Sequence, residues 1–184
     1  VVVYDVEQHE IITSPHLSSE ENMETFPAFS PDGRRLYFCS APACRMPESY
    51  REIRYNLQSI AFDPEKRSFG QEIDTLYNAN KERRSAKFPR VSMYTVSDYG
   101  NFSIWHKDAD LRLLDMLTCQ TDSLLQVNSN DVESYHSWSS NSRWFVFSSR
   151  RDDGLYTRPY ICYLGANCVP GKPLLLAQKE TDYY

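Results

Sequence analysis

The residues of this chain that are best suited to chemistry lie in its last third. Asp131, Glu133 and His136 are close neighbours, and two carboxylates beside an imidazole suit either a metal site or acid–base catalysis. The alternative is a structural role, because His136 stands at the start of a predicted strand. Asp152-Asp153-Gly154 offers the oxygen ligands that Ca²⁺ prefers, but the same composition is typical of a solvated turn. The sequence names no catalytic residue, and we expect no bound metal and no cofactor.

Two familiar kinds of catalytic motif are missing from the sequence. None of the four histidines lies in a His-Glu-x-x-His or Cys-x-x-Cys-His pattern. A serine hydrolase of the α/β type needs a Gly-x-Ser-x-Gly nucleophile elbow, and the nearest segment, Gly100-Asn101-Phe102-Ser103-Ile104, fails at its last position. We therefore expect a chain that is more suited to binding than to catalysis.

The five cysteines leave three interpretations open. An odd number leaves at least one thiol unpaired within the chain. Two pairs are close enough in sequence to bridge a loop, while neither has the tight spacing with nearby histidines that is usual for zinc. Unpaired structural thiols, a local disulfide and a metal site all stay possible for Cys39 with Cys44, for Cys162 with Cys168, and for Cys119.

The composition excludes some classes of function. Hydrophobic residues make up 41% of the 184 residues and charged residues 24%, which suits one globular domain with a sizeable core. The formal net charge of −5 gives no field that would hold a polyanion, so we expect no nucleic-acid partner. No apolar run approaches the roughly 18–20 residues of a membrane span, so we expect no transmembrane segment. The opening Val1-Val2-Val3-Tyr4 resembles the middle of a strand, and we expect that a segment upstream was removed or not observed.

Strand signals dominate the chain. Short apolar runs rich in aromatic and β-branched residues alternate with clusters of Pro, Gly, Asn, Asp and Ser. Asp63-Pro64-Glu65-Lys66 and Pro170-Gly171-Lys172 each separate two such runs and predict hairpin turns. The segment from Asp108 to Leu117 fits a helix or a strand equally well.

The strands belong to an internal repeat. Each copy begins with an aromatic residue, followed by any residue, a small residue, an aromatic residue, Ser, a polar turn and an apolar strand. Phe26–Phe38 is a complete copy, Tyr135–Phe147 repeats its pattern, and Phe88–Ser92 begins a third. Self-similarity at such a spacing is typical of a propeller or an array of stacked units.

A tight turn lies at the centre of the repeat, at Ser30-Pro31-Asp32-Gly33. Pro31 presets φ, Asp32 can accept hydrogen bonds from its own backbone, and Gly33 accepts a positive φ. In the second copy Asn141 and Ser142 replace Asp-Gly at some cost. The strand after the turn is nearly continuously apolar, which predicts that it is covered on both faces.

The third copy is interrupted. After Ser92 a turn and the start of a strand should follow, yet the chain passes directly to Met93-Tyr94-Thr95, which matches the end of that strand. We predict that several residues, including a turn like Pro-Asp-Gly, are missing between Ser92 and Met93.

These units resemble the TolB-like β-propeller repeat, also called the WD40-like or PD40 repeat. Its core is a Ser-Pro-Asp-Gly turn leading into an apolar strand, as in Phe29–Phe38. Ser97–His106 and Ser148–Tyr156 are similar to segments of TolB-like proteins of Bacteroidetes. The resemblance implies that residues 1–184 form one all-β domain, a β-propeller of four-stranded antiparallel blades with units starting near residues 26, 88 and 135. About three to four blades are represented, as part of a larger ring.

For function, the resemblance implies a periplasmic or outer-membrane-associated protein that binds another envelope protein or a glycan. The family repeat carries no catalytic residues. Propellers present loops on a rigid scaffold, and aromatic and Arg residues dominate known hot spots. The residues that we expect to contact a partner are Trp105, His106, His136, Arg150, Arg151 and Tyr156, with Asn101, Phe102, Tyr135 and Trp138 as further candidates.

The hypothesis favoured by the sequence is a non-catalytic, protein-binding scaffold of the bacterial envelope. One alternative is the propeller of a prolyl-oligopeptidase-type peptidase whose catalytic domain is absent from this chain. Another is a glycan-binding or carbohydrate-active propeller, which would require paired carboxylates for hydrolysis. A Gly-x-Ser-x-Gly segment elsewhere in the gene would favour the peptidase, and binding of oligosaccharides would favour the last alternative.

The interruption at Ser92 makes a direct prediction about mass. Because a turn and part of a strand are missing from the pattern, we expect the intact purified protein to weigh more than 21.5 kDa. Electrospray mass spectrometry measures this, and peptide mapping across Ser92 and Met93 localises the extra residues. A mass equal to that of the 184 residues would exclude the insertion.

Overall fold

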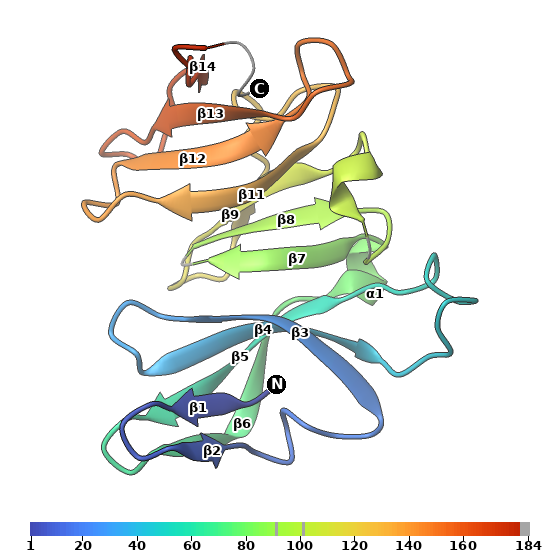
Figure 1. The fold of residues 1–184 in the computed structure, drawn as a ribbon, viewed down its shortest axis with the longest axis vertical. Helices are drawn as coiled ribbons and strands as arrows, with labels where there is room; N and C mark the ends of the chain where they lie inside the picture. The colour runs from blue at the N-terminus through green and yellow to red at the C-terminus, as the bar shows by residue number, and fades with distance from the viewer. Residues whose placement is uncertain (91, 101, 181–184) are drawn as a thin grey trace. The chain divides into compact units, whose positions relative to one another are not determined.

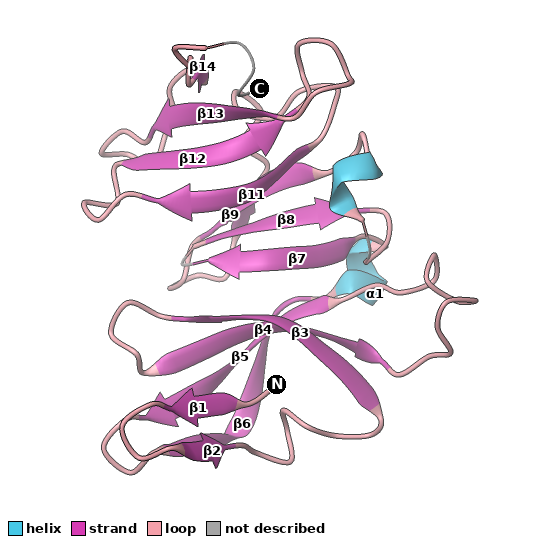
Figure 2. Cartoon of the chain, in the orientation of Figure 1, coloured by secondary structure: helices cyan, strands magenta, loops and turns pink. Residues whose placement is uncertain are grey.

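The regular secondary structure of the protein is almost entirely β-strand (Figure 2). The computed structural model describes residues 1–90, 92–100 and 102–180. All strand pairs within its sheets are antiparallel, so the expected all-β class is confirmed. Among the residues described, no helix has the length and apolar character needed to cross a membrane.

The strands form four sheets that follow one another along the chain (Figure 1). The first is a two-stranded hairpin. Three four-stranded sheets follow, each with its strands in sequence order, which agrees with the expected four-stranded antiparallel units. The first hairpin is β1 (Val3–Asp5) and β2 (Glu10–Ile12); the second sheet is β3 (Asn22–Phe29), β4 (Arg35–Pro42), β5 (Asn56–Asp63) and β6 (Ser68–Tyr77); the third is β7 (Ser85–Arg90), β8 (Met93–Ser97), β9 (Asp110–Leu114) and β10 (Thr121–Asp122); the fourth is β11 (Glu133–Trp138), β12 (Trp144–Ser149), β13 (Arg158–Tyr163) and β14 (Leu174–Leu175).

Within the described part of the chain, helical structure is limited to two short turns, α1 (Ala79–Glu82) and the 3₁₀-helix η1 (Ser103–Trp105). The segment from Asp108 to Leu117, whose sequence pattern fitted a helix and a strand equally well, contains the strand β9. By their contacts, the residues divide into two compact units, Val1–Val91 with Tyr99–Asn101, and Ser92–Asp98 with Phe102–Tyr184.

The predicted turn at Ser30-Pro31-Asp32-Gly33 is confirmed in detail. Gly33 has a φ of +68°, and its amide donates to the carbonyl of Ser30 at 2.9 Å. The carboxylate of Asp32 accepts from the Ser30 hydroxyl and from the amide of Arg34, and these bonds lower the pKa of Asp32. The Ser30 hydroxyl also accepts from the amide of Arg35, so the turn holds both ends of the β3–β4 hairpin.

The second copy of this turn has the same hydrogen bonds with different residues. The Asn141 side-chain oxygen accepts from the Ser139 hydroxyl at 2.7 Å and from the amide of Arg143 at 3.1 Å. Ser142 occupies the place of Gly33 and has a φ of +54°. The left-handed residue is thus Ser142, whereas the tolerance of Asn for this region was our reason to accept the substitution. An L-residue with a side chain pays a conformational cost there that Gly avoids.

A backbone feature that the sequence did not predict marks the start of each repeat. Phe26, Phe88 and Tyr135, the three aromatic residues that begin the copies, all have a positive φ, of 53°, 47° and 50°. In β3 and β11 the pairing with the next strand shifts register at this position. A bulky residue in the left-handed region is uncommon, so three equivalent occurrences support the repeat independently of the sequence.

The outer hairpins share a turn in which an aspartate accepts from two amides. Asp63 Oδ1 accepts from Glu65 and Lys66, both at 3.0 Å, so the predicted hairpin turn is confirmed. Asp5 and Asp115 make the same pair of bonds in the first and third sheets. These amides lower the pKa of all three carboxyl groups. In the fourth sheet β13 and β14 do form a hairpin, but its turn is not at the predicted residues 170–172. The chain turns at residues 165–168, where the amide of Cys168 donates to the carbonyl of Gly165 at 3.1 Å, and Pro170 is already paired with Leu164.

In the first unit, the core lies between the first hairpin and the second sheet. Leu36, Phe38 and Ile60 of the sheet are at most 1% exposed. Val3 and Ile12 of the hairpin pack against them. Removing this apolar surface from water is the main stabilising contribution of the contact.

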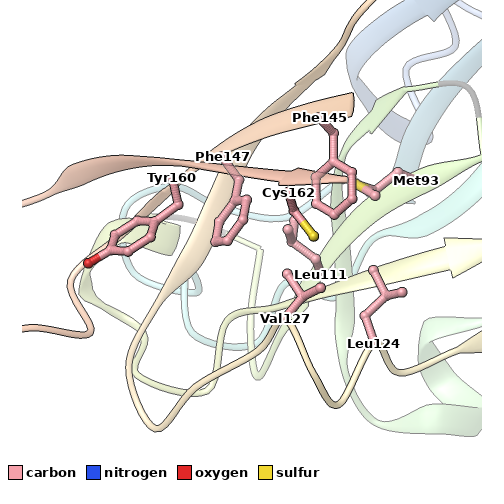
Figure 3. Packing of buried hydrophobic residues seen from close by; sticks show 8 residues of the cluster. All are labelled: Met93, Leu111, Leu124, Val127, Phe145, Phe147, Tyr160 and Cys162. Carbon is pink, nitrogen blue, oxygen red and sulfur yellow. The ribbon is translucent and has the colours of Figure 1, made fainter. Parts of the chain in front are cut away.

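The second unit has a core of the same design between the third and fourth sheets (Figure 3). Met93 and Leu111 project from the third sheet, and Phe145 and Phe147 project from β12 of the fourth. All four side chains are at most 2% exposed. In each unit, therefore, the core consists of apolar side chains from one face of a sheet packed against those of the sheet or hairpin that precedes it in the sequence.

The expectation that the strand after the turn is covered on both faces holds for only one of the two complete copies. In β4 every residue from Leu36 to Ala41 is buried. In β12 burial alternates: Phe145 and Phe147 lie in the core, but Trp144 on the other face is 40% exposed. On the same face Val146 and Ser148 are half-buried, whereas their counterparts Tyr37 and Cys39 in β4 are buried.

All five cysteines lie within the described residues and are free, so neither local disulfide is formed. Cys39 and Cys162 are buried, and burial raises the pKa of both thiols, that of Cys162 to about 11. Cys44, Cys119 and Cys168 are exposed. The stretch Val1–Tyr4 does lead into a strand, β1. The predicted insertion between Ser92 and Met93 concerns the sequence itself and stays a prediction.

The two versions of the hairpin turn predict opposite effects for reciprocal substitutions. Ser142→Gly should raise the free energy of unfolding by about 0.5–1 kcal/mol, because relief of the left-handed strain exceeds the added freedom of the unfolded chain. Gly33→Ser should lower it by about 1 kcal/mol through conformation alone, since nothing lies within 4 Å of an added Cβ. Urea denaturation with an unchanged m-value measures both effects. Changes of the same sign in the two variants would contradict this account.

Candidate functional site

The candidate site lies in the second unit, on the connections that follow β8 and β12. Figure 1 shows the loop between β12 and β13 and the helical turn before β9 on the same side of their unit. The two connections are joined by a hydrogen bond from Arg150 Nη1 to the carbonyl of Ile104 at 3.0 Å. Arg150, one of the expected contact residues, therefore couples the two loops.

The β12–β13 loop is shaped by Asp153. Its Oδ1 accepts from the amides of Leu155 at 2.8 Å and Tyr156 at 3.0 Å, and these bonds lower the pKa of the carboxyl group. The Gly154 amide donates to the carbonyl of Arg150 at 2.8 Å, with Gly154 at a φ of +69°. The backbone turns at Gly154 and presents Leu155 and Tyr156 to solvent, at 71% and 59% exposure.

Two ion pairs fix the base of this loop. Arg158, the first residue of β13, contacts Asp153 at 2.8 Å and Asp152 at 3.3 Å. Its guanidinium also lies over the ring of Tyr156, 6.0 Å from the centroid. Both aspartates considered as Ca²⁺ ligands are thus engaged by a cation, which opposes the binding of a second one.

The turn η1 presents an aromatic pair. Phe102 precedes it with a φ of +53° and accepts the amide of Trp105 on its carbonyl at 2.9 Å. The two rings stack with their centroids 4.8 Å apart and an interplanar angle of 24°. Trp105 is 69% exposed and Phe102 56%. An indole held in a tight turn and left largely in water loses little conformational freedom on binding, as hot-spot residues require.

The expected contact residue His106 points inward. Its side chain is 4% exposed, and Nδ1 lies 3.7 Å from Asp108 Oδ1. The carbonyl of His106 accepts from the amide of Ala109, and its own amide donates to Ser103. This histidine holds the loop between η1 and β9 in shape and is not part of the exposed surface.

His136 is also buried, because it alternates with Tyr135 along β11. His136 is 4% exposed and its Nε2 lies 3.2 Å from the carbonyl of Met93, whereas Tyr135 is 53% exposed. The structural interpretation of His136 agrees with this placement. Trp138, the third candidate of this group, packs on Phe145 in the core.

Glu133 is fully buried, and both of its oxygens accept hydrogen bonds. Oε1 accepts from the hydroxyls of Ser129 and Ser149, at 2.6 and 2.8 Å, and from Arg151 Nη2 at 3.0 Å. Oε2 accepts from the amide of Ser129 at 2.9 Å. A buried carboxyl group whose two oxygens accept hydrogen bonds from neighbouring side chains and backbone has a structural role in this arrangement.

Arg151 completes this buried network. Its guanidinium lies over the rings of Phe147 and Tyr160, 5.2 and 4.6 Å from their centroids, and Nη2 donates to the carbonyl of Val127 at 2.7 Å. Burial raises the pKa of Tyr160 to about 12, so its phenol is neutral at neutral pH. Arg151 therefore anchors the start of the β12–β13 loop instead of facing a partner.

The structure thus separates the predicted residues into two groups. Trp105, Phe102 and Tyr156 are exposed, and Arg150 holds their loops together. His106 and His136 are buried, and Arg151, with 18% of its side chain exposed, is paired with Glu133. Asn101 lies outside the described residues. The sequence analysis did not predict Leu155 as a contact residue. The signal that could have identified it is an apolar residue directly after Gly154, in a turn that needs none. In the part of the chain that the structure describes, no group of three His, Cys, Asp or Glu is placed to hold a metal ion.

No family model matches this chain, and no curated protein is significantly similar to it. The resemblance to TolB-like repeats therefore depends on the motifs in the sequence alone.

Substitution of Glu133 tests whether its network supports the site. In Glu133→Gln one of two acceptor positions becomes an NH₂ group that faces a donor, so we expect a loss of about 2–4 kcal/mol in the free energy of unfolding. Glu24→Gln is the matched control, because Glu24 has the equivalent position opposite Ser40 and, among the residues that the structure describes, accepts one weak hydrogen bond, from the Ser19 hydroxyl at 3.5 Å. The control should change stability by about 0.5 kcal/mol or less. Equal losses in both variants, measured by denaturant titration, would show that the buried network has no special role.

Proposed function

We propose that this chain forms about three to four blades of a TolB-like β-propeller, and that it acts as a non-catalytic binding scaffold. Each four-stranded sheet corresponds to one blade, and the first hairpin to the two outer strands of another. The repeated turn, the repeated left-handed aromatic residue and the repeated outer aspartate turn support this assignment. The packing of successive sheets face to face in each unit is the packing that blades require.

The binding surface consists of Phe102, Trp105, Leu155 and Tyr156, which we call the loop surface. The single observation that carries the proposal is the stacked and exposed pair of Trp105 and Phe102 on a turn fixed by Arg150. Large apolar side chains in water cost free energy unless a partner covers them. The supporting residues Arg150, Arg151 and Arg158 are half-buried and hydrogen-bonded, so the loops are organised before the partner arrives.

The partner that we propose is another protein of the bacterial envelope. The periplasmic or outer-membrane location follows from the resemblance to TolB-like proteins. Aromatic side chains with an adjacent Arg are the usual composition of a protein hot spot. The stacked pair also favours one second candidate, a glycan, because a flat aromatic surface accommodates the apolar face of a sugar ring.

A photoreactive amino acid in place of Trp105 tests this function. In cells of the source organism we expect it to form an adduct of discrete mass with an envelope protein. The same group in place of Leu117, which is 96% exposed in a turn of the third sheet, is the matched control and should form none. Once the partner is known, Trp105→Ala should weaken its binding by about 30-fold, the loss of a hot spot worth about 2 kcal/mol.

The adduct also distinguishes the candidates. An adduct whose mass decreases on treatment with glycosidases and which contains no second polypeptide would favour the glycan. Equal cross-linking from positions 105 and 117, or no adduct from either, would exclude the loop surface as a binding site.

A further inference from the structure

The first unit contains a connection that is much longer than its hairpin needs. β4 ends at Pro42 and β5 begins at Asn56, so thirteen residues, 43–55, join two neighbouring antiparallel strands. In the same sheet four residues are enough to join β5 to β6. Figure 1 shows this connection, which we call the β4–β5 loop, extending from its sheet on the side of α1. Loops of this length in a compact domain are typically either functional or disordered.

The base of the β4–β5 loop is firmly anchored, so the loop is not a disordered one. Ile53 and Tyr55 are 4% and 6% exposed. The amide of Gly100 donates to the carbonyl of Ile53 at 2.7 Å, and the amide of Tyr55 donates to the Ser85 hydroxyl at 2.9 Å. A Cβ added at Gly100 would lie 2.4 Å from the Tyr55 ring, so this close approach requires glycine. Two other segments of the first unit thus hold the loop in place.

The outer part of the loop presents a guanidinium between two tyrosines. The rings of Tyr50 and Tyr99 meet edge to face, with centroids 5.8 Å apart. Arg51 Nε donates to the Tyr50 hydroxyl at 2.9 Å, and the guanidinium carbon lies 5.4 Å from the centroid of the same ring. The hydrogen bond with Tyr50, with a smaller contribution from Tyr99, raises the pKa of the Arg51 guanidinium. Arg51 is therefore exposed and yet held in a defined position.

The charge of Arg51 is not neutralised by a carboxylate. In residues 1–90, 92–100 and 102–180 no ion pair includes Arg51, whereas Arg45 of the same loop pairs with Glu48 at 3.7 Å. A guanidinium has five N–H donors, of which the Tyr50 hydroxyl takes one, and its planar shape matches the two oxygens of a carboxylate. An arginine presented in this way is suited to bind a carboxylate from another molecule.

The surroundings of Arg51 are basic, although the chain as a whole is acidic. The loop is joined to the start of α1, because the Asn56 side-chain oxygen accepts from the amide of Ala79 at 2.8 Å. Residues 43–56 and 78–84 together contain six Lys and Arg against three Glu, whereas the whole chain contains 20 against 25. Met46 in the same loop is 49% exposed, and Met, Tyr and Arg are enriched at protein interfaces. The local excess of positive charge favours an acidic partner.

We propose that the β4–β5 loop is a second interaction surface, where Arg51 binds an aspartate or glutamate side chain of an acidic segment of another protein. Tyr50 and Tyr99 position the guanidinium in advance, so little conformational freedom is lost when the carboxylate binds. The net charge of −5 opposes a long polyanion, so the segment is short. This surface lies entirely in the first unit and is independent of the loop surface.

Titration with a defined peptide tests the assignment. The probe is acetylated hexaglutamate, added to the ¹⁵N-labelled 184-residue chain while NMR follows the Arg51 Nε–Hε signal and the backbone amides of the loop. We expect these signals to shift with a Kd on the order of 1 mM. Arg51→Gln should weaken the binding about tenfold or more, because a charge-assisted hydrogen bond is lost. Tyr50→Phe, which keeps the ring but removes the hydroxyl that holds Nε, should weaken it about fivefold.

Arg45→Gln is the matched control, since this cation of the same loop is already paired and its loss should change the Kd about twofold or less. Circular dichroism verifies that all variants are folded. Signals that stay unchanged up to about 10 mM peptide, or equal losses in Arg45→Gln and Arg51→Gln, would overturn the proposal. Inorganic phosphate that binds as tightly at the same ionic strength would overturn it too, because the surface would then select small anions. Arg51→Gln should not alter cross-linking from Trp105, so failure of this inference is distinguishable from failure of the proposed function.

Discussion

A β-sheet with two apolar faces is stable only when both faces are covered, and most of the packing in this chain follows from that requirement. β4 shows it most clearly, since Leu36 and Phe38 point to one neighbour while Tyr37 and Cys39 point to the other, and all four are buried. Full burial of one such side chain contributes about 1.5–3 kcal/mol, so the loss of a neighbouring sheet would outweigh any single turn or ion pair. The cores of the two units are two instances of this one arrangement.

The covering of both faces also accounts for the strained residue at the start of each repeat. A left-handed aromatic residue costs of order 1–3 kcal/mol and persists only where its surroundings determine it. The ring of Phe26 contacts those of Tyr55 and Phe88, with centroids 6.1 and 4.5 Å away. The strained backbone thus turns an aromatic side chain into the space between sheets, and the packing that it gains offsets its cost.

Much of the fold was predictable from the sequence because turns have local causes. The hairpin turns at Ser30–Gly33 and at Asp63–Lys66 depend on residues within the turn itself, and both were predicted. The positive φ of Phe26 and Tyr135 was not predicted, since nothing in an aromatic residue favours that region and tertiary packing selects it. The incomplete burial of β12 was missed for a related reason. The repeat pattern is the same in the two copies, so it does not record how much of each strand its surroundings cover.

The candidate site was predicted less well than the fold. Position in the repeat identified the loops that carry Trp105 and Tyr156, and these residues are exposed. It did not determine which way a side chain points, because neighbouring residues in a strand face opposite sides and one step in register exchanges them. His136 and Tyr135 illustrate this exchange. Arg151 was expected to contact a partner because arginine is common in hot spots, and its inward placement depends on Glu133, eighteen positions earlier in the sequence.

The outer turn at Asp5, Asp63 and Asp115 has a consequence for how such a chain evolves. Each sheet that carries it contains all the residues needed to close its last hairpin, and it requires other sheets only at its two faces. A gene segment encoding one sheet can therefore be duplicated or deleted as a block without redesign of the turns on either side. Natural relatives of this chain should accordingly differ in length by whole sheets, while insertions inside a sheet should be confined to the loops between strands.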